Sequence, residues 1–168
     1  MSMLPYIGIL VCIILSAFFS ASEISYASAN QLRLKNKSEA GNKYAKIALY
    51  ISDNFNEALS TILIGNNLVN IAASSIAAVA IIDLFGNKGT ILSTFIMTVI
   101  ILIFGEITPK TIAKKLANKY VLFAAYPLRI LMFIIKPAVK VVTFIVDLFS
   151  RLWKKDEEES GLTEEDIA

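Results

Sequence analysis

Three polar clusters interrupt otherwise apolar stretches of this chain, and their side chains offer only oxygen ligands. The clusters are FFSASEIS at 18–25 with Ser20 and Glu23, IGNNLVNI at 64–71 with Asn66 and Asn70, and FGEITPKTIA at 104–113 with Gly105 and Glu106. Hydroxyl, amide, carbonyl and carboxylate oxygens are the ligands that Mg²⁺, Ca²⁺ and Na⁺ prefer. The chain has no histidine and one cysteine, Cys12, which disfavours zinc, copper or haem sites and histidine-based catalysis. The clusters therefore predict a hard-cation site, and no catalytic residues are expected.

The third cluster carries the strongest signal. Glu106 ends the apolar run 90–104 and is followed closely by Pro109. Carboxylates at membrane depth are costly and usually mark an ion or proton path. Because Pro109 has no N–H to donate to the Gly105 carbonyl, we expect a helix break that leaves this carbonyl free beside the carboxylate. Alternatively, Glu106 pairs with Lys110 four residues on, and Glu23 pairs with a basic loop residue.

Helical spacing gathers the other polar residues on single faces. Asn66 and Asn70 are four apart, as are Ser16 and Ser20, so each pair shares a helix face. Gly65 allows another helix to approach closely. Taken singly, serine, glycine and asparagine in membrane helices are often packing residues. Taken together, the clusters favour one inward-opening pocket that suits a partly or fully dehydrated Mg²⁺, which usually takes six oxygens at about 2.0–2.1 Å.

The elements that must position these clusters are membrane helices. The chain has 168 residues, of which 56% are hydrophobic, and its mean hydropathy is +0.65. Stretches 59–82 and 90–104 carry no charge and 3–19 is nearly uncharged, whereas a spanning helix needs about 20 mostly apolar residues. The sequence predicts an all-α integral membrane domain, with spans over about 3–29, 57–83 and 89–107.

The distribution of basic residues predicts the orientation. Lysines and arginines gather between the first and second predicted spans and again after the third. Basic loops remain cytoplasmic, so we expect the N-terminus and the turn 83–89 outside the cell and the C-terminus in the cytoplasm. The membrane in which we expect the protein is the plasma membrane.

Two further regions are expected on the cytoplasmic side. Residues 30–56 have apolar positions at helical spacing and predict juxtamembrane helices. Residues 120–153 mix apolar and basic positions, which indicates an interfacial belt helix bent at Pro137; the alternative is a pair of tight spans. The acidic segment 156–168 is expected to begin a further soluble helix, with Thr163 and Asp166 as a loose capping box.

In their order along the chain, the three motifs closely resemble the membrane domain of the cyclin M (CNNM)/CorC family of magnesium transporters. The resemblance covers essentially the whole sequence. It implies a homodimer in the lipid bilayer, with 1–155 as the transmembrane domain and 156–168 as the start of an acidic cytoplasmic helical bundle. A pair of CBS domains that binds ATP-Mg²⁺ would follow, and no nucleic-acid partner is expected.

The resemblance also implies Mg²⁺ export coupled to Na⁺ entry, from an inward-facing pocket that holds a dehydrated ion. The residues that match the family's pocket are Ser20, Asn66, Asn70, Gly105 and Glu106, with Pro109 as the helix break. Glu23 stands where animal relatives have asparagine, and it would serve a secondary Na⁺ site or a gate. The alternative function is a Mg²⁺-sensing membrane anchor that regulates cytoplasmic modules without transporting.

Overall fold

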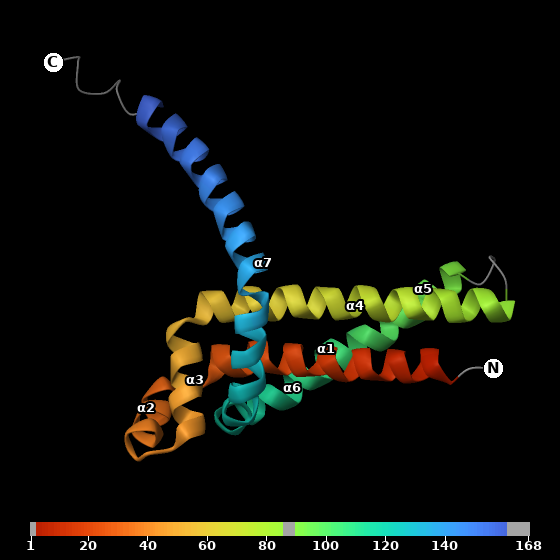
Figure 1. The fold of residues 1–168 in the computed structure, drawn as a ribbon, viewed down its shortest axis with the longest axis horizontal. Helices are drawn as coiled ribbons and strands as arrows, with labels where there is room; N and C mark the ends of the chain where they lie inside the picture. The colour runs from red at the N-terminus through yellow and green to blue at the C-terminus, as the bar shows by residue number, and fades with distance from the viewer. Residues whose placement is uncertain (1–2, 86–89, 161–168) are drawn as a thin grey trace. The chain divides into compact units, whose positions relative to one another are not determined.

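The computed structural model describes residues 3–85 and 90–160. Helices make up the described part of the chain, and no strand occurs in it, which confirms the all-α class. The elements are α1 (Leu4–Ser28), α2 (Gln31–Glu39), α3 (Lys43–Asp53), α4 (Phe55–Phe85), α5 (Thr90–Ile100), the π-helix η2 (Ile101–Ile107), α6 (Thr108–Lys115) and α7 (Ala117–Ser160) (Figure 1). The chain divides into two compact units, Met1–Met132 and Phe133–Ala168.

Three of the described helices are long and apolar enough to cross a membrane, namely Leu4–Ser28, Phe55–Ile82 and Thr94–Lys115. Only 22%, 28% and 17% of their most apolar windows are buried within the chain, so most of this apolar surface is left for lipid or other protein. The third helix extends further past Glu106 than the predicted span 89–107. Within the described residues, helix α7 is not among these candidates.

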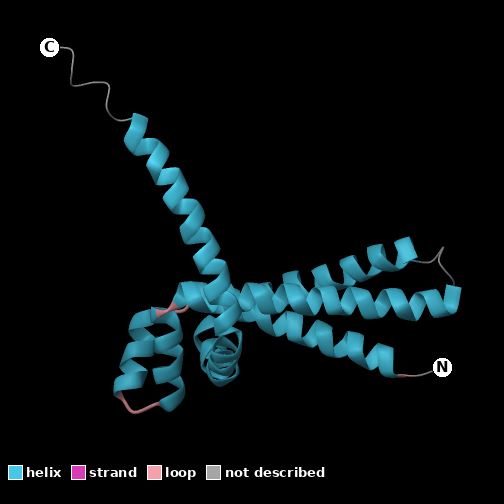
Figure 2. Cartoon of the chain, turned by 45° about the horizontal axis from the view of Figure 1, so that its top comes forward, coloured by secondary structure: helices cyan, strands magenta, loops and turns pink. Residues whose placement is uncertain are grey.

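Helices α1 and α4 run antiparallel and side by side (Figures 1 and 2). Gly8 of α1 faces Ile76, and Phe19 faces Gly65, so positions rise along one helix as they fall along the other. The ring of Phe19 lies where a side chain at residue 65 would stand. This contact confirms that Gly65 permits a close helix approach, because any larger residue would displace the ring.

The third membrane helix, formed by α5, η2 and α6, crosses α1. Figure 1 shows α5 and α6 on opposite sides of α1, and Figure 2 shows the three helices spreading apart toward the end that carries the N-terminus. Small alanines allow α4 to pack here against the third helix: Ala73 and Ala77 are buried with Met97 and Ile101. The crossing brings η2 beside the polar part of α1.

Two short helices, α2 and α3, occupy the segment between the first two membrane helices. Asn30 and Asn42 cap them, accepting hydrogen bonds from the backbone N–H groups of Arg33 and Ala45 at 2.9 and 3.0 Å. The turn between them uses Gly41 with φ +87°, a conformation that favours glycine. Helix α3 buries one face, with Ala45, Ala48 and Ile51, whereas α2 buries only Leu34.

Helix α7 is a single helix that continues through Pro137, and it contains the whole segment 120–153 predicted as a belt helix. A proline removes one backbone hydrogen bond, but its φ near −65° remains compatible with a helix. The N-terminal part of α7 is anchored to the membrane unit. Tyr26 donates from its buried hydroxyl to the Val121 carbonyl at 3.1 Å, and the Arg129 guanidinium lies 4.0 Å from the centre of the Tyr50 ring. The predicted capping pair Thr163 and Asp166 lies outside the described residues.

Candidate ion-binding site

The helix does not break at Pro109, and this corrects the prediction from the sequence. Residues Ile101–Ile107 widen into a π-helix, in which the N–H of Thr108 donates to the carbonyl of Ile103, five residues back. Ile107 and Thr108 keep right-handed helical dihedrals, and Pro109 stands in the first turn of α6. A proline ring clashes with the carbonyl four residues earlier in an α-helix, and the wider turn relieves this clash while the chain stays helical.

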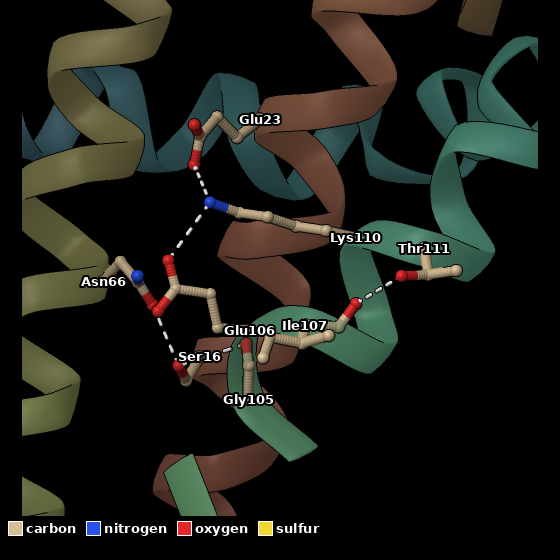
Figure 3. Close-up of polar contacts among 8 residues, drawn as sticks. All are labelled: Ser16, Glu23, Asn66, Gly105, Glu106, Ile107, Lys110 and Thr111. Carbon is tan, nitrogen blue, oxygen red and sulfur yellow. Dashed lines mark hydrogen bonds and ion pairs between the residues drawn. The ribbon is translucent and has the colours of Figure 1, made fainter. Parts of the chain in front are cut away.

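The wide turn makes the Gly105 carbonyl available to another helix. The Ser16 hydroxyl of α1 lies 3.4 Å from this carbonyl oxygen and 2.9 Å from the Asn66 Oδ1 of α4 (Figure 3). A Cβ at residue 105 would lie 2.8 Å from Ser16 Oγ, so only glycine permits this approach. Because a hydroxyl has a single proton, Ser16 satisfies one of the two acceptors at a time.

Ser16 is the site residue that sequence reasoning missed. It is fully buried and joins all three membrane helices at one level. Its only signal in the sequence is the four-residue spacing from Ser20, which places both serines on one face of α1.

Two further oxygens of the predicted site are buried without a partner. Among the described residues, Ser20 Oγ and Asn70 Oδ1 are buried and accept or donate no hydrogen bond, and Ser52 Oγ of α3 is a third such atom. Ser20 is one helical turn from Ser16, and Asn70 is one turn from Asn66. Since α1 and α4 are antiparallel, the two lie on opposite sides of the Ser16–Asn66 contact and extend its polar lining. Leaving such groups unsatisfied costs about 1–3 kcal/mol each. Because the two oxygens lie about two helical turns apart along the helices, a single cation would contact at most one of them.

Lys110 joins the two carboxylates near this lining. Its Nζ lies 3.1 Å from Glu23 Oε2 and 3.2 Å from Glu106 Oε1. The Glu106–Lys110 pair considered from the sequence is therefore present. Glu23 shares the same lysine, which lies in helix α6 and not in a loop. Figure 3 shows the Glu106 carboxylate pointing toward the side chains of Asn66 and Lys110. All three charged side chains are partly exposed, so the carboxylates lie where the polar lining meets solvent.

The chemistry of this set is restricted to hard cations. Within residues 3–85 and 90–160, no three histidine, cysteine or acidic side chains come together as a metal cluster. An ion here would be held by neutral oxygens, one of them the backbone carbonyl of Gly105, with Glu106 as the nearest carboxylate. The structure brings Ser16, Asn66 and Gly105 into direct contact, whereas Ser20, Asn70 and Glu106 surround that contact.

Three long apolar helices around a polar lining define the chain as a multi-pass membrane protein. Residues 7–168 match the family described as the cyclin M transmembrane N-terminal domain, and the chain belongs to that family. The resemblance recognised in the three motifs is thereby confirmed.

Relatives extend across bacteria and plants. The chain is 40% identical over 146 residues to a UPF0053 protein of Haemophilus influenzae, covering 87% of this chain and 34% of that protein. It is 33% identical over 138 residues to the UPF0053 inner membrane protein YfjD of Escherichia coli, covering 82% and 32%. A chloroplastic DUF21 domain-containing protein of Arabidopsis thaliana is 32% identical over 163 residues, covering 95% and 25%. The chain thus spans about a third of the length of these two bacterial relatives and a quarter of the plant one.

Proposed function

We propose that this chain is the membrane domain of a magnesium transporter that exports Mg²⁺ in exchange for Na⁺. The observation that carries the proposal is the contact of the buried Ser16 hydroxyl with Asn66 Oδ1 and with the Gly105 carbonyl, which gathers oxygens from three membrane helices. Ser20 Oγ and Asn70 Oδ1 lie one turn away on either side without a partner. A transporter-type role is consistent with membership of the cyclin M family. Buried oxygens without donors are costly in a metal-free pocket and become favourable when a cation binds them.

The spacing of the lining oxygens is compatible with Mg²⁺ as the cargo, as the spacing of any hydrogen-bonded pair of oxygens would be. In an octahedral shell with metal–oxygen distances of about 2.0–2.1 Å, neighbouring oxygens are about 2.9 Å apart. Ser16 Oγ and Asn66 Oδ1 are 2.9 Å apart. An ion could therefore replace the hydrogen bond between them once the hydroxyl proton rotates away, without moving either oxygen. Glu106 would neutralise half of the ion's charge, and the Gly105 carbonyl would replace a water molecule.

The setting of the domain follows from the same proposal. We place it in the plasma membrane as a homodimer, with the N-terminus outside and the polar lining opening to the cytoplasm. The Escherichia coli relative is named an inner membrane protein, which supports this location. The remainder of the full-length protein would supply the acidic helical bundle and the CBS pair on the cytoplasmic side. No catalytic role is proposed for any residue.

The first test measures Mg²⁺-dependent thermal stabilisation of the purified chain in detergent. A ligand that binds only the folded state raises stability with the logarithm of its concentration over Kd. We expect the stabilisation to vanish in Glu106→Ala and to persist in Glu39→Ala, which removes an exposed carboxylate of α2. Equal stabilisation in all three proteins would reject the proposed site.

The second test separates transport from sensing. The wild-type chain reconstituted in liposomes should move Mg²⁺ down its gradient, with a rate that depends on Na⁺ on the opposite side. Binding in detergent without flux in liposomes would instead identify a Mg²⁺-sensing membrane anchor.

A further inference from the structure

Lys110 places its ammonium between carboxylates that belong to different membrane helices. Glu23 is on α1 and Glu106 is on η2, and the two lysine–carboxylate distances are nearly equal, at 3.1 and 3.2 Å. Figure 3 shows the ammonium lying between the two acids. A lysine has three donors and no acceptor, so it can hold both carboxylates at once.

The two carboxylates differ in their surroundings. Glu106 adjoins Gly105, whose carbonyl faces the buried hydroxyl of Ser16. Glu23 pairs with Lys110 and forms no other interaction that the described residues reveal. The Lys110 ammonium thus donates one hydrogen bond to Glu106, next to the candidate ion site. It also pairs with Glu23, which lies outside that site.

A divalent ion at Glu106 would repel the ammonium that already holds this carboxylate. The ammonium holds Glu106 through Oε1 alone, so an ion on Oε2 would still stand within a few ångströms of it, and the two cations would repel each other in this partly desolvated site. The lysine side chain has a flexible four-carbon stem, and its terminal bonds can turn without any change in the backbone. Glu23 lies 3.1 Å from the ammonium, so it can remain the ion-pair partner of Lys110 when the ion binds Glu106.

We infer that Lys110 is a tethered competitor of the transported cation, which holds Glu106 in the ion-free site and transfers fully to Glu23 when the ion binds. This inference rests on the proposed function. It assigns to Glu23 the role of a positioning residue that withdraws the lysine from the site. The return of the ammonium to Glu106 would oppose rebinding after the ion has left, so the lysine assists release as well as limiting affinity.

The competition has a defined sign. The apparent Kd equals the intrinsic Kd divided by the fraction of molecules in which Glu106 is available. Removing the ammonium therefore tightens Mg²⁺ binding. Removing Glu23 leaves the ammonium on Glu106 and weakens Mg²⁺ binding, although Glu23 itself contacts no ion. A lysine that only braced α1 against α6 would behave differently, because loss of either partner would then impair the site in the same direction.

The test is Mg²⁺ binding by titration calorimetry for the wild type, Lys110→Met, Glu23→Gln and the double variant. If the ammonium holds Glu106 in about nine-tenths of ion-free molecules, Lys110→Met lowers the apparent Kd about tenfold. Glu23→Gln should raise it, and the double variant should match Lys110→Met because Glu23 acts only through the lysine. Lys114→Met removes an exposed lysine of the same helix and should leave Kd unchanged.

Lys110→Met could fail to fold, so a second variant that keeps the positive charge is also measured. Lys110→Arg retains the cation and offers a bidentate fork that holds carboxylates more firmly, so it should weaken Mg²⁺ binding. The inference is overturned if Lys110→Met leaves the apparent Kd unchanged or raises it, or if Glu23→Gln acts equally with and without the lysine. Tight wild-type binding that Glu106→Ala abolishes, together with an unchanged Kd in Lys110→Met, would reject this inference alone. Absence of Mg²⁺ binding in the wild type would reject the proposed function itself.

Discussion

Ser16 Oγ and Asn66 Oδ1 lie 2.9 Å apart, and this contact joins α1 to α4 at the level where the third membrane helix widens. One turn along α1, the ring of Phe19 packs directly on Gly65. The Phe19–Gly65 contact therefore sets the distance between α1 and α4, and this distance allows Ser16 and Asn66 to reach each other. The site is determined by the register of α1 and α4 as much as by the residues that line it.

The Ser16 hydroxyl should stabilise the metal-free fold. Ser16→Ala removes the donor that faces Asn66 Oδ1 and the Gly105 carbonyl, leaving buried acceptors unsatisfied. We expect a loss of about 1–3 kcal/mol in the free energy of unfolding, measured by denaturation in detergent. Ser28→Ala, at the exposed end of α1, is the control and should change the same quantity by less than about 0.5 kcal/mol. Equal effects of the two variants would show that the Ser16 contact contributes nothing.

A methyl group at residue 105 should damage the site more than the fold. In Gly105→Ala the new Cβ would stand 2.8 Å from Ser16 Oγ and force the serine away. We expect loss of Mg²⁺-dependent thermal stabilisation and a destabilisation of about 1–3 kcal/mol. Gly8→Ala is the matched control, because its Cβ would meet only the tip of the Ile76 side chain at 3.3 Å. Retained Mg²⁺ stabilisation in Gly105→Ala would contradict the assignment of this carbonyl to the site.

Pro109 should maintain the π-helix. Pro109→Ala restores an N–H at residue 109 and removes the ring, so the segment can return to α-helical hydrogen bonding with the Gly105 carbonyl as acceptor. The carbonyl would then be withdrawn from the lining, and we expect weaker Mg²⁺ binding by calorimetry. Pro137→Ala, in α7, should leave the affinity unchanged. The same affinity in wild type and Pro109→Ala would mean that the proline has no part in exposing the carbonyl.

The contact between Arg129 and Tyr50 should help to hold α7 on α3. The guanidinium lies 4.0 Å from the ring centre, which is a cation–π geometry. Because Arg129 is exposed, the coupling energy should be about 0.5–1 kcal/mol. A double-mutant cycle of Arg129→Gln and Tyr50→Leu, read by thermal unfolding, measures this energy. Simple additivity of the two single variants would show that the two side chains act independently.

Much of the architecture was predictable because it depends on local properties. Hydrophobic length defines the membrane helices, since a span requires a minimum run of apolar residues whatever lies beside it. The sequence also indicated that Glu106 and Pro109 mark a special position. A proline has no N–H to donate, so the carbonyl four residues earlier loses its helical partner in any helix. Sequence reasoning thus reached Gly105 and Glu106 as candidate site residues, along with the shared faces of Asn66 and Asn70.

Only the tertiary structure decided which of these groups meet. Sequence reasoning predicted a break at Pro109, because the local effect of a proline is known from sequence, whereas the ability of the helix to widen around it is not. The role of Ser16 and the shared hold of Lys110 on Glu23 and Glu106 depend on the register between helices far apart in the sequence. That register is set by side-chain packing such as the ring of Phe19 on Gly65, and packing is a property of two surfaces together rather than of either segment alone.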